Sequence, residues 1–197
     1  MSDEVRTWLA DGTRLFLSGL DKLTDAEFDA PTGLPGWTRR HLVAHVHHNA
    51  EALRRLVRWA RTGEETRMYL DRAHRDAEIE QSARLPVPRL RELVRTSAAD
   101  LAADLAGLPA PAWHNEVVTA QGRTVPASEI PWMRVREVTV HAVDLDAGIG
   151  FDDLPDELNL ALALDVLRRR SANGEAAGLV GWLTGRAAEP PTMGSWL

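Results

Sequence analysis

Histidine and glutamate residues are placed in this sequence at spacings that suit metal binding. The stretch GWTRRHLVAHVHHNA carries His41, His45 and His48, which at about 100° per residue fall within roughly a 60° arc of one helix. Further along, REVTVHAVDL places Glu137 and His141 four residues apart, so their side chains lie one helical turn above each other. Both stretches therefore present ligand-type side chains on one helix face.

Two such helices, facing each other, can build a metal site with three protein ligands. One histidine from the first stretch, together with Glu137 and His141, leaves a fourth tetrahedral position open, as a catalytic zinc requires. An open position can hold water or an incoming thiolate, and a bound zinc lowers the pKa of a thiol. Because the chain has no cysteine, any thiol must be supplied from outside.

Spacing alone leaves less specific interpretations open. A Glu–His pair at this spacing is often a solvated pair on a helix surface, and clustered histidines are often surface residues. His41 and His48 can support the site or face solvent, and Asp144 can orient a ligand from behind or face solvent.

Long amphipathic helices are expected to position these residues. Capping residues and apolar periodicity predict a mainly all-α chain built on a four-helix bundle, with long crossovers at residues 63 to 86 and 107 to 127. A small hairpin is expected around Gln121–Gly122, and a helix from Ser128 that ends at Gly148 and Gly150. We expect a bundle domain at residues 1–150 and a short helical extension at residues 151–197.

Composition restricts the partners. The net charge of −6 argues against nucleic acid, because neutralising phosphates needs a basic surface. No apolar run approaches the 18 or so residues of a membrane span, and the acidic N-terminal stretch does not look like a secretory signal. A cytoplasmic protein without a membrane partner is therefore expected.

Three segments resemble the mycothiol-dependent maleylpyruvate isomerase family: GWTRRHLVAHVHHNAEAL, RTGEETRMYL and EVVTAQGRTVPASEIPWMRVREVTVHAVDL. The resemblance implies a DinB-like four-helix bundle, a divalent metal that is usually zinc, and mycothiol as the thiol cofactor. It implies His45, Glu137 and His141 as metal ligands, Arg75 as a substrate-binding arginine, and Arg186, in LTGRA, as a second one.

The family reaction converts maleylpyruvate to fumarylpyruvate in gentisate breakdown. The resemblance implies that a thiolate adds to the cis double bond, the resulting single bond rotates, and the thiolate leaves, while arginines hold the carboxylates of the dicarboxylate substrate. Two alternatives stay open: a mycothiol S-transferase acting on another electrophile, and a non-catalytic metal- or ligand-binding helical module. Family members carry a C-terminal α/β portion, whereas residues 151–197 are predicted to be helical, so that portion is expected to be reduced.

Overall fold

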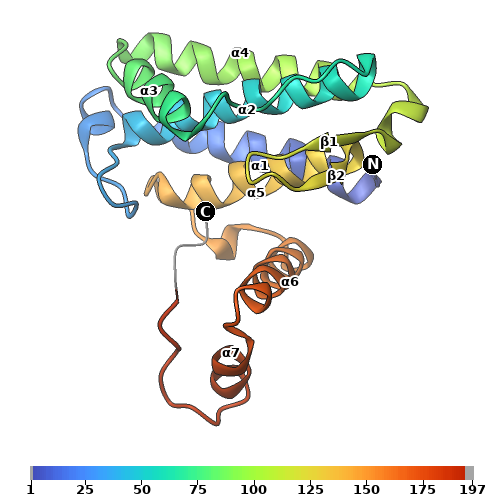
Figure 1. Cartoon of the computed structure of the whole chain (residues 1–197). Coiled ribbons are helices and arrows are strands. Elements are labelled where there is room, and N and C mark those ends of the chain that lie inside the picture. Colours follow the sequence, from blue (N-terminus) through green and yellow to red (C-terminus); the bar gives the residue numbers. More distant parts are fainter. Residues whose placement is uncertain (1, 194–197) are drawn as a thin grey trace. The chain divides into compact units, whose positions relative to one another are not determined.

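The computed structural model describes residues 2–193, and within them the chain is mainly helical, as the sequence predicts (Figure 1). Short 3-10 turns and one small hairpin join the α-helices. In chain order the elements are α1 (Asp3–Lys22), η1 (Ala26–Asp29), α2 (Arg39–Thr62), α3 (Arg72–Ala83), α4 (Val87–Ala106), η2 (Ala110–His114), β1 (Glu116–Val118), β2 (Thr124–Pro126), η3 (Ala127–Glu129), α5 (Ile130–Asp144), η4 (Phe151–Asp153), α6 (Asp156–Ala172) and α7 (Ala176–Leu183).

Local capping chemistry sets several helix ends. The Ser2 side chain accepts a hydrogen bond from the Val5 N–H at the start of α1, and Asp71 does the same for His74 at the start of α3. Helix α2 ends at Thr62 and is followed by Gly63, whose φ of 77° is the left-handed conformation that glycine adopts without strain. The end of α2 falls where the first predicted crossover begins, at residue 63.

Helix α5 is shorter than its sequence pattern suggests. It begins at Ile130 rather than Ser128, because residues 127–129 form the 3-10 turn η3 and Pro131 occupies the first α-helical turn. It ends at Asp144 rather than at the glycines further on, because the chain leaves the helical conformation at Asp146, with φ of 51°.

The predicted hairpin is present between α4 and α5. Strands β1 and β2 pair antiparallel, with Val117 opposite Val125, and Gly122 in the turn has a φ of 75°. Val117 is fully buried in the apolar cluster that also holds residues of α2, so the hairpin is fastened to that helix.

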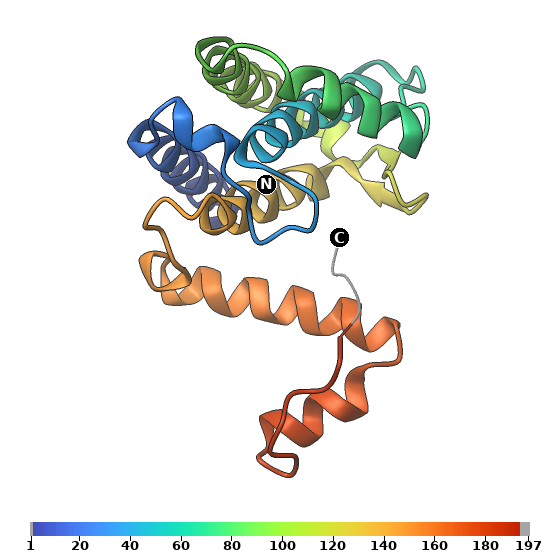
Figure 2. The ribbon, with the colours of Figure 1, turned by 90° about the vertical axis from the view of Figure 1, so that its left-hand side faces the viewer.

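Four long helices form the body of the first unit. Helix α1 packs along α5, α2 packs along α4, and α2 also contacts α5, an arrangement that Figures 1 and 2 show from two directions. At Gly12 an added Cβ would lie 2.7 Å from the Thr139 methyl group, so the close approach of α1 and α5 depends on a glycine there. The DinB-like bundle expected from the sequence is consistent with this packing.

The backbone contacts divide the chain into two compact units, one that ends at Gly150 and one that begins at Phe151. The first unit contains α1 to α5 and the hairpin, and the second contains α6 and α7. Among the described residues, no helix is both long and apolar enough to cross a membrane.

Candidate metal centre

The structure brings His45, Glu137 and His141 together between α2 and α5. His45 Nε2 lies 2.9 Å from Glu137 Oε2, and His141 Nε2 lies 3.5 Å from the same oxygen. The two imidazole rings meet edge to face, with centroids 5.0 Å apart. One ligand atom from each residue lies within 4.8 Å of the other two, close enough to share one ion.

This cluster is buried, and burial and pairing act in opposite directions on its pKa values. Burial alone would raise the pKa of Glu137, but hydrogen bonds with His141 and His45 hold it well below its usual range. Burial lowers the pKa of His45 despite its contact with Glu137. For His141, burial also lowers the pKa, but hydrogen bonds to Asp144 and Glu137 outweigh it and raise the pKa to about 9. A cation that binds here therefore competes with a proton on His141, so its affinity falls as the pH falls below about 9.

Asp144 fixes the orientation of the His141 ring. Its Oδ2 atom lies 2.7 Å from His141 Nδ1 and accepts a hydrogen bond from it. The other ring nitrogen, Nε2, is buried, and its contact with Glu137 Oε2, at 3.5 Å, is long for a hydrogen bond. A metal-ligating imidazole usually donates a hydrogen bond from one ring nitrogen to a carboxylate or carbonyl, and binds the metal through the other nitrogen. Of the two interpretations open for Asp144, the contact favours the orienting one.

These residues fit a divalent cation. Two imidazoles and one carboxylate are a ligand set found in catalytic zinc sites, which keep a fourth position for water or substrate. The long contact of the buried His141 Nε2 points to the same requirement, because a buried polar atom without a well-formed hydrogen bond costs free energy unless something else binds it.

We expect Asp144→Ala to weaken zinc binding about tenfold to a hundredfold, because the His141 ring loses the hydrogen bond that holds it. Competition with a chromogenic chelator measures this affinity. Asp146→Ala is the control, since the side chain of Asp146 is 88% exposed and faces Arg39. Equal zinc affinity in the Asp144 and Asp146 variants would contradict the role given to Asp144.

His41 and His48 do not join the cluster. His41 Nδ1 accepts a hydrogen bond from the Thr38 N–H at the start of α2, while its Nε2 lies 3.0 Å from Glu80 on α3. His48 Nε2 lies 2.8 Å from Ser82 Oγ, also on α3. Both histidines therefore attach α3 to α2, and neither offers a ligand atom to the cluster.

Arg75, at the N-terminal end of α3, reaches the cluster from the other side of His45. One guanidinium nitrogen lies 3.3 Å from His45 Nδ1, another lies 2.9 Å from Asp76 Oδ1, and the group sits 5.9 Å from the centre of the Tyr69 ring. The Trp37 ring also approaches His45, with centroids 5.3 Å apart. A cavity of about 320 Å³ adjoins these side chains, lined by Gly36, Trp37, His41, Arg72, Arg75, Asp76, Ile79 and Glu80.

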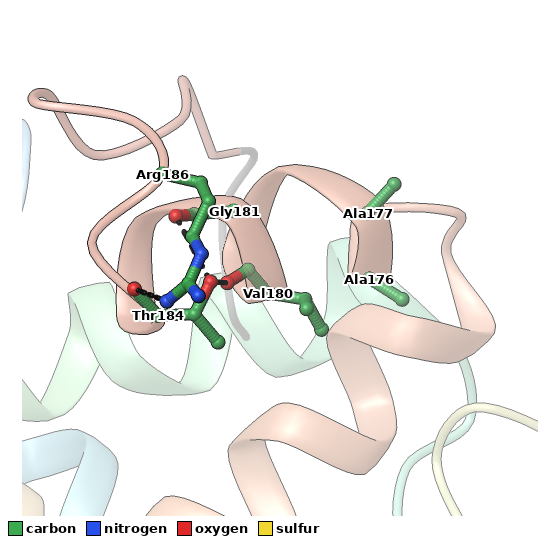
Figure 3. A pocket seen from close by; sticks show the side chains of 6 residues that line it. All are labelled: Ala176, Ala177, Val180, Gly181, Thr184 and Arg186. Carbon is green, nitrogen blue, oxygen red and sulfur yellow. Dashed lines mark hydrogen bonds between the residues drawn. The ribbon is translucent and has the colours of Figure 1, made fainter.

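Arg186 lies in the second unit, in the turn that follows α7 (Figure 3). Its guanidinium donates a hydrogen bond to the Thr184 carbonyl, and its backbone N–H bonds to the Gly181 carbonyl at 2.7 Å. It borders a surface hollow lined by Ala176, Ala177, Val180, Gly181, Thr184 and Arg186. Its role as a second substrate-binding arginine stays a prediction from the resemblance.

Sequence reasoning missed three residues beside the ligands: Trp37, Tyr69 and Arg134. Arg134 precedes Glu137 by three residues and so shares its helix face. This spacing could have indicated that Arg134 lies near the ligands. Trp37 and Tyr69 lie in loops, where the spacing of residues along the sequence does not indicate which way a side chain points.

The chain is similar to proteins of one known family. The family model described as the mycothiol maleylpyruvate isomerase N-terminal domain matches residues 9–146. A crystal structure of the mycothiol-dependent maleylpyruvate isomerase matches with a TM-score of 0.83 and 44% sequence identity, over 86% of this chain and 71% of that one. The crystal structure of a histidine-to-alanine mutant of that enzyme matches with the same TM-score and 43% identity, over the same shares of the two chains. A comparison with curated protein sequences gives no match.

The fold and the site thus define a DinB-like helical protein with a candidate three-ligand metal centre. More specifically, the chain belongs to the mycothiol maleylpyruvate isomerase family, because the family model covers most of its length.

Proposed function

We propose that this chain catalyses the mycothiol-dependent isomerisation of maleylpyruvate to fumarylpyruvate, with a divalent cation held by His45, Glu137 and His141. The observation that carries the proposal is the convergence of these three side chains within 4.8 Å. It occurs in a chain that is 44% identical to a mycothiol-dependent maleylpyruvate isomerase. Zinc is the cation we propose, because this donor set is typical of catalytic zinc. The cytoplasmic location expected from the sequence stays a prediction.

The metal and mycothiol would together supply an activated thiol nucleophile. When bound, the cation lowers the pKa of a thiol, and mycothiol supplies the nucleophilic sulfur that a chain without cysteine does not have. Glu137 is the one ligand of the three that carries a formal negative charge, so the three ligands would leave a divalent cation with net positive charge, which favours an anionic fourth ligand such as a thiolate. Asp144 holds His141 in the orientation that such a site needs.

Arg75 is proposed to hold a carboxylate of the substrate. A guanidinium carries five N–H donors, and the contacts with His45 and Asp76 use only part of them. The side chain is 27% exposed, so a ligand in the adjoining cavity can reach it. A bidentate contact at one end of the substrate fixes its position and leaves the reacting carbon–carbon bond free to rotate.

The test is an isomerisation assay with maleylpyruvate and mycothiol on zinc-loaded protein. We expect fumarylpyruvate to accumulate over many turnovers for each mycothiol, with the free thiol undiminished at the end, because an isomerase regenerates its nucleophile. Consumption of one thiol for each molecule of substrate would instead identify an S-transferase. Zinc binding without either product would indicate a non-catalytic module.

A further inference from the structure

Arg134 is a buried arginine that connects α5 to α2 next to the candidate ligands. Only 1% of the residue is exposed. One of its guanidinium nitrogens donates hydrogen bonds to the Val46 carbonyl and to Asn49 Oδ1, both at 2.8 Å. Val46 directly follows the ligand His45 in the sequence, and Asn49 lies one turn further along α2.

Burying this cation costs free energy that its visible partners do not fully offset. Both acceptors are neutral, and none of the described carboxylates lies within ion-pair distance of it. Burial lowers the pKa of Arg134 to about 10, although the negative charge of Glu137 acts in the opposite direction. An apolar side chain would suit such a position better on stability grounds alone, so its presence points to a requirement for a specific arrangement.

The position of Arg134 indicates what that arrangement is. The body of the first unit contains two apolar clusters, and α2 and α5 each contribute residues to both. Each helix has a break between its two sets of cluster residues. On α2 the break falls between Val46 and Ala50, and on α5 it falls between Met133 and Val138. The polar layer between the clusters contains the ligand Glu137 and the Arg134–Asn49 link.

We infer that Arg134 is a positioning residue for the metal centre, which holds α5 against α2 at the register where Glu137 and His141 meet His45. The inference rests on the proposed metal-binding function. Hydrogen bonds form over a narrow range of distances, so two of them from one guanidinium nitrogen fix the separation of α5 from Val46 and Asn49.

Loss of the Arg134 charge and loss of its hydrogen bonds would change the metal affinity in opposite directions. A guanidinium near a bound cation repels it, so removing the charge alone would tighten metal binding. Loss of the link would instead weaken metal binding, because Glu137 and His141 would no longer be held opposite His45. The direction of the change in affinity therefore separates the two effects.

The experiment measures the zinc dissociation constant of the full chain by competition with a chromogenic chelator. The variants are Asn49→Ala, which removes one of the two hydrogen bonds of Arg134 without changing charge, and Arg134→Met, which removes both. We expect each to weaken zinc binding at least about tenfold, while far-ultraviolet circular dichroism in chelator stays like that of the wild type. Arg54→Met is the matched control, since Arg54 links α2 to Asp100 and Asp104 on α4, and its affinity is expected to match the wild type.

Unchanged zinc affinity in Asn49→Ala, or tighter binding in Arg134→Met, would overturn the inference. So would an equal loss of affinity in Arg54→Met, because the effect would then reflect general loosening of the bundle. If Arg134→Met does not fold, Asn49→Ala decides the question by itself. A wild-type protein that binds no zinc would instead overturn the proposed function.

Discussion

Glu137→Gln protein is expected to bind zinc at least about a hundredfold more weakly than the wild type and to lose mycothiol-dependent turnover. Glutamine keeps the size of the side chain but removes the charge that faces both His45 and His141. Complete four-ligand zinc sites bind with roughly 10–16 kcal/mol, which corresponds to about 3 kcal/mol for each ligand and to about a hundredfold in affinity. His45→Ala and His141→Ala are expected to show the same loss.

Chelator competition gives the zinc affinity, and the isomerisation assay gives the turnover. Glu129→Gln is the matched control, because Glu129 is exposed at the start of the same helix and none of its described contacts involves the ligands. Its zinc affinity and activity are expected to equal those of the wild type. Undiminished zinc in the Glu137, His45 and His141 variants together would remove these residues from the metal site.

Arg75→Ala is expected to raise KM for the substrate tenfold to a hundredfold and to leave the zinc content unchanged. Hydrogen bonds from a guanidinium to a carboxylate contribute roughly 1.5–3 kcal/mol, which corresponds to that range. Zinc is retained because Arg75 approaches His45 at Nδ1, whereas Glu137 faces Nε2 of the same ring. Steady-state kinetics over a range of maleylpyruvate concentrations measures the effect.

The control for this variant is Arg89→Ala, an exposed arginine on α4 that pairs only with Glu92 among its described contacts. Its kinetics are expected to match the wild type. Arg75→Lys separates charge from geometry: lysine keeps the charge but not the bidentate contact, so an intermediate KM is expected. An unchanged rate at low substrate in Arg75→Ala would exclude a role in substrate binding.

Helical periodicity was sufficient to propose Glu137 and His141 with one histidine of the earlier helix, because these residues lie on regular helices. The family resemblance then selected His45 among His41, His45 and His48. A spacing of four residues places Glu137 and His141 on one face of α5 in any packing of the chain. Periodicity does not show that α2 faces α5 at His45, because this depends on the tertiary packing. The family resemblance implied this contact. Capping residues and apolar periodicity predicted the helical class of the chain, since those signals are local.

The spacing of residues in the sequence could not predict contacts that depend on how separate elements pack together. Arg75 meets His45 because α3 packs on α2, where Glu80 and Ser82 bind His41 and His48, which lie far from them in the sequence. The early start predicted for α5 failed because a 3-10 turn and an α-helix share the same capping and apolar signals over three residues.

X-ray absorption spectroscopy of the zinc-loaded protein, before and after addition of mycothiol, tests most directly whether the three side chains share one cation with a free position. The account predicts two imidazoles and one carboxylate oxygen around zinc at about 2.0–2.2 Å, and a new sulfur neighbour at about 2.3 Å once the thiol is added. The chain has no cysteine, so a thiolate at that distance must come from mycothiol. Fewer than two imidazoles, or a spectrum that mycothiol leaves unchanged, would contradict the account.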